Sequence, residues 1–127
     1  MWPPINDITT ELDKALEAQL RAYPYVQPLL LPLPPARAFD AALAAARDVG
    51  LAIVNADAAA GAITAVATTR MLRFKDDVTI RVSADAAGSR IDVRSKSRIG
   101  RGDLGTNARR IRRLLDAVRA RTGSESR

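Results

Sequence analysis

The fold is decided by residues 75–97, KDDVTIRVSADAAGSRIDVRSKS. Apolar and polar side chains alternate over residues 78–82 and 91–97, which is the period of a β-strand that buries one face. Residues 85–88 between them, Asp-Ala-Ala-Gly, have the composition of a tight turn. We therefore predict an antiparallel hairpin. Its core face would carry Val78, Ile80, Val82, Ile91 and Val93, and its wet face Thr79, Arg81, Ser83, Asp92, Arg94, Lys96 and Arg98.

Upstream of this hairpin, β-branched residues predict two further strands at residues 51–55 and 63–69, with turns at 57–61 and 75–77. Helices are predicted at residues 36–50 and from Thr106 onward, where apolar residues recur at helical spacing. The second helix would bury Ala108, Ile111, Leu114, Leu115 and Val118, and turn Arg109, Arg112, Arg113 and Asp116 outward. The fold class is therefore α+β, a four-stranded antiparallel meander with two main helices packed on one face.

Residues 1–35 read as an N-terminal arm. Residues 11–22 have apolar side chains at helical spacing, and Thr10 is placed to cap a short helix there. Five prolines within residues 24–35 predict an extended, polyproline-like connector. Residues 36–122 form the α+β domain and residues 123–127 a frayed tail, so we expect one domain overall.

Composition excludes several classes of chemistry. The 127 residues include neither Cys nor His, so thiolate or imidazole metal sites and Ser-His or Cys-His nucleophile pairs cannot form. We expect no cofactor and no metal. The net charge is +6, and residues 89–127 hold 12 basic and 4 acidic side chains. The C-terminal third therefore faces an anionic partner or, alternatively, is an ordinary solvated surface of an arginine-rich composition.

Several segments carry a family resemblance: residues 5–10, Ala22-Tyr23-Pro24, residues 74–82 and residues 89–112. Together they resemble an uncharacterised bacterial family, the domain of unknown function 1499. The chain departs from that family at residues 12–21, where it looks shorter. The resemblance implies no reaction, substrate or catalytic residue. Some members of that family carry the domain behind membrane-spanning segments, so the resemblance implies the cell envelope as an alternative location. The chain as it stands predicts a cytoplasmic location.

The loop between the last strand and the last helix is the first candidate site. Its glycines, Gly100, Gly102 and Gly105, allow tight turns, and a helix N-terminus offers unpaired N–H groups to an anion. Arg94, Arg98, Arg101, Thr106 and Asn107 are the expected anion-binding residues. The alternative is an internal role, in which Asp103 accepts from Arg98 or Arg101 and the loop is purely structural.

Two other surfaces carry cations. On the wet sheet face, Arg81, Arg94, Lys96 and Arg98 could meet an anionic partner or form ordinary cross-strand pairs. The arginine-rich last helix could meet nucleic-acid phosphates. Against nucleic acid, the aromatic residues look too scattered for a stacking platform, and no nucleic-acid-binding signature accompanies the charge. The scattered set is Trp2, Tyr23, Tyr25, Phe39 and Phe74.

We therefore predict a small, basic, non-enzymatic binding module for an acidic protein partner or a small anion. Two alternatives stay open: an enzyme that uses the carboxylates of Asp7 and Asp103, and a non-specific nucleic-acid binder. Membrane contact is expected only through a segment that this sequence does not contain.

Overall fold

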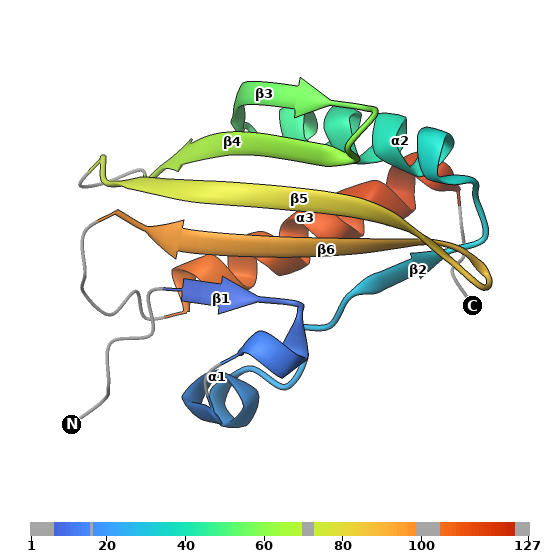
Figure 1. Ribbon diagram of the computed structural model, residues 1–127. Helices are drawn as coiled ribbons and strands as arrows, with labels where there is room; N and C mark the ends of the chain where they lie inside the picture. The colour runs from blue at the N-terminus through green and yellow to red at the C-terminus, as the bar shows by residue number, and fades with distance from the viewer. Residues whose placement is uncertain (1–6, 16, 70–72, 99–104, 124–127) are drawn as a thin grey trace.

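The computed structural model describes residues 7–15, 17–69, 73–98 and 105–123. One antiparallel sheet of six strands forms its central layer, and two long helices cover one face of that sheet (Figure 1). The strand order is β1-β6-β5-β4-β3, with β2 also paired to β6. The α+β class is thus confirmed.

The predicted meander is present as β3 (Ala52–Asp57), β4 (Ala62–Thr68), β5 (Lys75–Asp85) and β6 (Gly88–Ser97). Its central hairpin pairs Ile80 with Val93, as the shared core face requires. The turn predicted at residues 75–77 is wrong, because β5 already begins at Lys75. Asp76 lies inside the strand and is buried, which a carboxylate tolerates only with a charged partner. That partner is Arg110.

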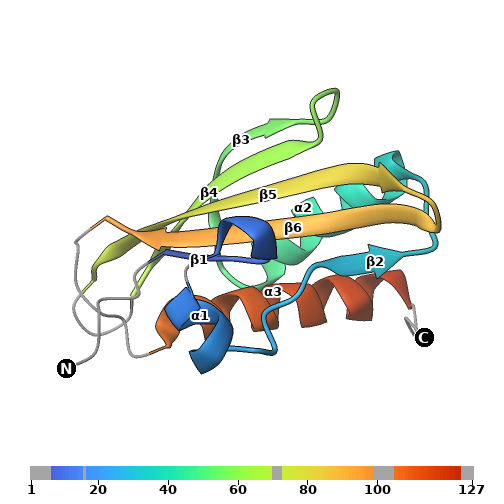
Figure 2. The ribbon, with the colours of Figure 1, turned by 60° about the horizontal axis from the view of Figure 1, so that its bottom comes forward.

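The prediction of four strands is incomplete, because the sheet has six. β1 (Asp7–Thr9) and β2 (Leu29–Leu31) both pair with β6, at opposite ends of the same edge (Figures 1 and 2). Three residues are too few to display a period, and β2 lies inside the proline-rich connector, where prolines argue against a strand. Pairing with the long β6 selects the extended form of both segments.

The single arm helix predicted at residues 11–22 is also wrong. A 3-10 turn, η1 (Leu12–Lys14), is followed by extended backbone at Ala15, and α1 spans Glu17–Ala22. Thr10 does not cap a helix. Its N–H donates to the Val93 carbonyl and its hydroxyl accepts from the Val93 N–H, so Thr10 extends the β1–β6 pairing.

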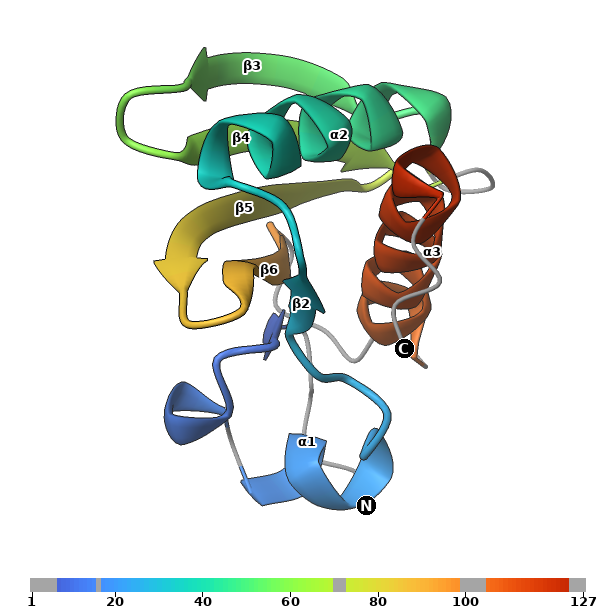
Figure 3. The ribbon, with the colours of Figure 1, turned by 90° about the vertical axis from the view of Figure 1, so that its right-hand side faces the viewer.

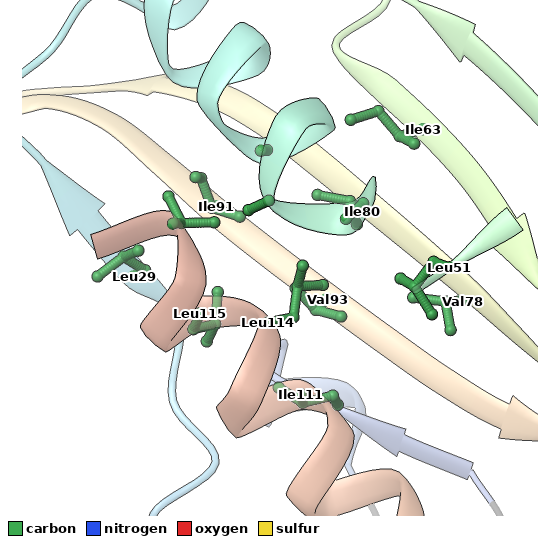
Figure 4. Packing of buried hydrophobic residues seen from close by; sticks show 14 of the residues in the cluster. Leu29, Leu51, Ile63, Val78, Ile80, Ile91, Val93, Ile111, Leu114 and Leu115 are labelled. Carbon is green, nitrogen blue, oxygen red and sulfur yellow. The ribbon is translucent and has the colours of Figure 1, made fainter. Parts of the chain in front are cut away.

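Two helices, α2 (Pro35–Asp48) and α3 (Thr106–Thr122), lie side by side on one face of the sheet (Figure 3). Proline at the first position starts α2, and Gly50, with φ +87°, follows its end. All five predicted apolar residues of α3 are buried against the sheet. Figure 4 shows Leu114 beside Val93 of β6, and Ile111 and Leu115 belong to the same core cluster.

Candidate functional site

A buried polar network anchors the first two turns of α3 to the sheet. Ser95 Oγ donates to Asn107 Oδ1 at 2.6 Å, and Asn107 Nδ2 donates to Ser97 Oγ at 3.0 Å. Arg110 Nη1 lies 2.7 Å from Asp76 Oδ2 and also donates to Ser95 and Asn107. The side chains of Arg110 and Asp76 are only 13% and 3% exposed. Because a buried ion pair needs its partners in place, this network fixes which face of α3 points outward.

The outward face of α3 presents arginines. Arg109, Arg112 and Arg113 are exposed, while Ile111 and Leu114 on the opposite side are buried. Among the described residues, neither Arg112 nor Arg113 lies within ion-pair distance of a carboxylate.

Two tyrosines lie beside these arginines. The rings of Tyr23 and Tyr25 meet edge to face with centroids 6.2 Å apart. Arg112 Cζ lies 5.3 Å from the centroid of the Tyr25 ring, which is a cation–π distance. Tyr25 is 43% exposed. The tyrosine pair therefore turns one side toward solvent next to α3.

The close approach of Tyr23 to the start of α3 holds this arrangement together. Gly105, the residue before α3, has φ +88°, and a Cβ there would lie 2.9 Å from Arg109 Nη1 and 3.4 Å from the Tyr23 hydroxyl. A side chain at Gly105 would push these groups apart. We call Tyr25, Arg109, Arg112 and Arg113 the arginine–tyrosine surface.

Sequence reasoning missed this surface because it treated the aromatic residues as scattered. Tyr23 and Tyr25 form no row of exposed rings, but they contact each other and the connector places them against α3. The Tyr-Pro-Tyr spacing of residues 23–25 was the available signal. Only the contact with Arg112, 87 positions further along the chain, gives it meaning.

The predicted anion-binding residues lie on two sides of the sheet. Arg94 and Arg98 project from the open face, which neither α2 nor α3 covers. Ser95 and Ser97, which alternate with them along β6, contact Asn107 on the helix side. Thr106 is also on that side, in the first turn of α3, and Gly105 precedes it. The remaining predicted residues, Gly100, Arg101, Gly102 and Asp103, lie outside the described residues.

Carboxylates of the chain already engage Arg94 and Arg98 on the open face. Arg94 donates to both oxygens of Asp7 at 2.8 and 2.6 Å, and this pairing raises the pKa of Arg94. Arg98 donates to both oxygens of Asp77, and this hydrogen bonding lowers the pKa of the Asp77 carboxyl. Asp7, one of the two carboxylates of the enzyme alternative, therefore accepts from Arg94 in this structure.

One wet-face assignment needs correction. Asp92 is 8% exposed, because the Thr10 hydroxyl donates to its Oδ1 and Arg90 donates to its Oδ2. The arm thus packs over this end of the open face. Glu11 and Asp13 lie close enough to Arg90 to contribute to its raised pKa, after the larger effect of Asp92.

The excess positive charge consequently lies on the helices. Seven cations and seven carboxylates balance on and beside the open face: Lys14, Lys75, Arg81, Arg90, Arg94, Lys96 and Arg98 against Asp7, Glu11, Asp13, Asp57, Asp77, Asp85 and Asp92. The outer surface of α2 and α3 holds seven arginines against three aspartates, a balance of +4: Arg37, Arg47, Arg109, Arg112, Arg113, Arg119 and Arg121 against Asp40, Asp48 and Asp116.

A comparison with known protein families assigns the chain to one of them. A family model described as "Protein of unknown function (DUF1499)" matches residues 6–118. The chain belongs to the DUF1499 family. This confirms the resemblance seen in the sequence, and the DUF1499 match includes the arginine–tyrosine surface and the network beneath it. No curated protein matches the chain.

The part of the chain that the structure describes lacks two types of site. No three His, Cys, Asp or Glu side chains there come together as metal ligands. None of the helices described is both long and apolar enough to span a bilayer.

Proposed function

We propose that this protein is a non-enzymatic binding module that receives an acidic protein partner on the arginine–tyrosine surface. The observation that carries the proposal is the unequal distribution of charge. Arg112 and Arg113 have no carboxylate partner among the described residues and lie on a surface with an excess of arginines, whereas the open face balances its charges and pairs three of its arginines directly. An acidic partner can engage cations that have no internal carboxylate partner without breaking an existing ion pair.

The composition of this surface favours a protein as the partner. Tyrosine and arginine are enriched among the residues that dominate binding energy at protein interfaces. Tyr25 offers a large ring that the stacked Arg112 guanidinium already orients, so little side-chain entropy remains to be lost on binding. Single-stranded nucleic acid would need several exposed ring faces in a row, and among the described residues only Tyr25 is an exposed aromatic.

The test compares three anionic probes: fluorescein-labelled poly-L-glutamate, a labelled oligothymidylate, and inorganic phosphate. Anisotropy measures binding of the two labelled polymers, and thermal shift measures phosphate. The variant is Arg112→Glu/Arg113→Glu. The matched control, Arg81→Glu/Lys96→Glu, changes the net charge by the same −4 on the open sheet face.

We expect poly-L-glutamate to bind wild type at low salt and to weaken at least about tenfold in the helix variant, with a smaller change in the control. Equal weakening in both variants would mean that net charge alone drives binding, and would overturn the proposal. Tighter binding of oligothymidylate than of poly-L-glutamate would favour the nucleic-acid alternative.

The phosphate arm tests the predicted small-anion site of Arg94, Arg98, Arg101, Thr106 and Asn107. Phosphate would have to compete with Asp7 for Arg94 and with Asp77 for Arg98. A phosphate-dependent rise in Tm that disappears in Arg98→Ala would support that site in place of the arginine–tyrosine surface.

A further inference from the structure

Among the strands that the structure describes, β3 forms the one uncovered edge of the sheet. This strand pairs only with β4 on one side, and five of its six residues are exposed. α2 lies under β3, and no other described element flanks its outer side (Figures 1 and 3). Val54 is 66% exposed, more than any other large hydrophobic residue that the structure describes. An edge of this kind presents unpaired N–H and C=O groups to any strand that approaches.

The opposite edge of the sheet is closed in two ways. At β1, the buried Gln19 side chain donates to the Thr9 carbonyl at 2.7 Å and accepts from the Thr9 N–H at 3.1 Å, so its amide takes the place of a neighbouring strand. At β2, Pro28 and Pro32 flank a strand of three residues. Prolines and short strands both discourage further pairing.

At β3 the usual protection is almost absent. Residues 49–68 contain no Lys, Arg or Pro, and their single charge is Asp57. A bulge between Ile53 and Asn55 interrupts the register with β4, and the ladder continues through Asn55, Ala56 and Asp57. The chain therefore closes one edge with specific side chains and leaves the other available.

We infer that β3 is a self-association edge, where two copies of this chain pair their β3 strands antiparallel about a two-fold axis. The charge distribution favours this edge over the helix surface for contact between two copies. The molecule carries +6 overall, so contact through the helix surface would oppose excess arginines, whereas the β3–β4 hairpin holds no cation.

The one charge on the strand also permits this pairing. In a symmetric pairing centred on β3, Asp57 lies opposite Ala52 of the other copy. Because the bulge removes one step from the regular spacing, the two Asp57 residues are then about 14 Å apart along the strand, beyond the ~8 Å screening length at physiological salt. The Val54 side chains come close to the axis, where burying them adds apolar contact.

Sedimentation equilibrium of the full chain tests this inference. A strand-pairing interface of this size is small, so we expect a weak dimer whose mass rises from 13.7 kDa toward twice that value between about 10 µM and about 1 mM. Val54→Lys places a cation on the edge and should weaken association at least about tenfold. The matched control is Leu30→Lys, because Leu30 is 50% exposed on β2 at the opposite edge.

Hydrogen exchange at low and high protein concentration gives a second measurement that needs no variant. Amides of β3 should gain protection at high concentration, while those of β2 should not change. A wild-type chain that stays at 13.7 kDa up to about 1 mM overturns the inference, as does equal loss of association in the two lysine variants. Neither result bears on the arginine–tyrosine surface, so this inference and the proposed function fail separately.

Discussion

Removing the Asp76 carboxylate should lower the free energy of unfolding far more than removing the carboxylate of its neighbour Asp77. Both aspartates lie on β5 and both pair with an arginine, at 2.7 and 2.9 Å. They differ in burial: Asp76 is 3% exposed and Asp77 is 53% exposed. Asp76→Ala leaves the buried Arg110 guanidinium without its counter-charge, a change that costs about 3–5 kcal/mol of the free energy of unfolding. At about 4 °C per kcal/mol for a domain of this size, the Tm should fall by about 12 °C or more.

Urea denaturation followed by far-UV circular dichroism measures both variants. Asp77→Ala should shift the midpoint only slightly, because water and salt screen an exposed pair. The double variant Asp76→Leu/Arg110→Met should recover most of the lost stability, since it removes both buried charges together. Equal losses in Asp76→Ala and Asp77→Ala would refute the view that the buried network holds α3 in place.

Three further outcomes follow from single contacts. Thr10→Val should cost about 1–3 kcal/mol in urea denaturation, because Asp92 and the Val93 N–H both lose a buried hydrogen bond. Gly88→Ala should lower the free energy of unfolding by about 3 kcal/mol or more, because φ is +142° and a Cβ would lie 2.5 Å from the Leu31 carbonyl oxygen. In the control Gly50→Ala the Cβ would meet open space, so only the backbone strain remains, about 1–2 kcal/mol. In an NMR titration the Asp77 carboxyl should protonate below its ordinary pKa, and Arg98→Ala should raise that pKa; the stability from this pair is present above the unfolded-state pKa and is lost as pH falls through the folded-state value.

The N-terminal arm shows why part of the fold could not be predicted from the sequence. Residues 7–9 and 29–31 are too short to display the two-residue period of a β-strand. Their pairing partners lie on β6, at least 58 residues away. The helix predicted at residues 11–22 failed for a related reason. Thr10, expected as a helix cap, bonds to β6, and Gln19 bonds to β1. Local propensity was outweighed by long-range pairing.

The candidate site divides in the same way. Helical spacing alone placed Arg109, Arg112 and Arg113 on the outer side of the last helix, and the structure confirms it. Nothing in the sequence could say that Tyr25 would lie against Arg112. The charge count could not show which cations are neutralised, since the partner of Arg94 is 87 residues away and that of Arg121 is 73 residues away.

The sequence by itself determined the period-two and helical patterns, and hence the central meander, the two main helices and the buried face of each. It also determined the chemistry that the chain lacks, because a residue type that is absent cannot be supplied by folding. Only the tertiary structure decided which strands complete the sheet, which edge stays open and which arginines keep a free charge. These properties depend on contacts between distant segments, which burial and geometry select and which no local pattern encodes.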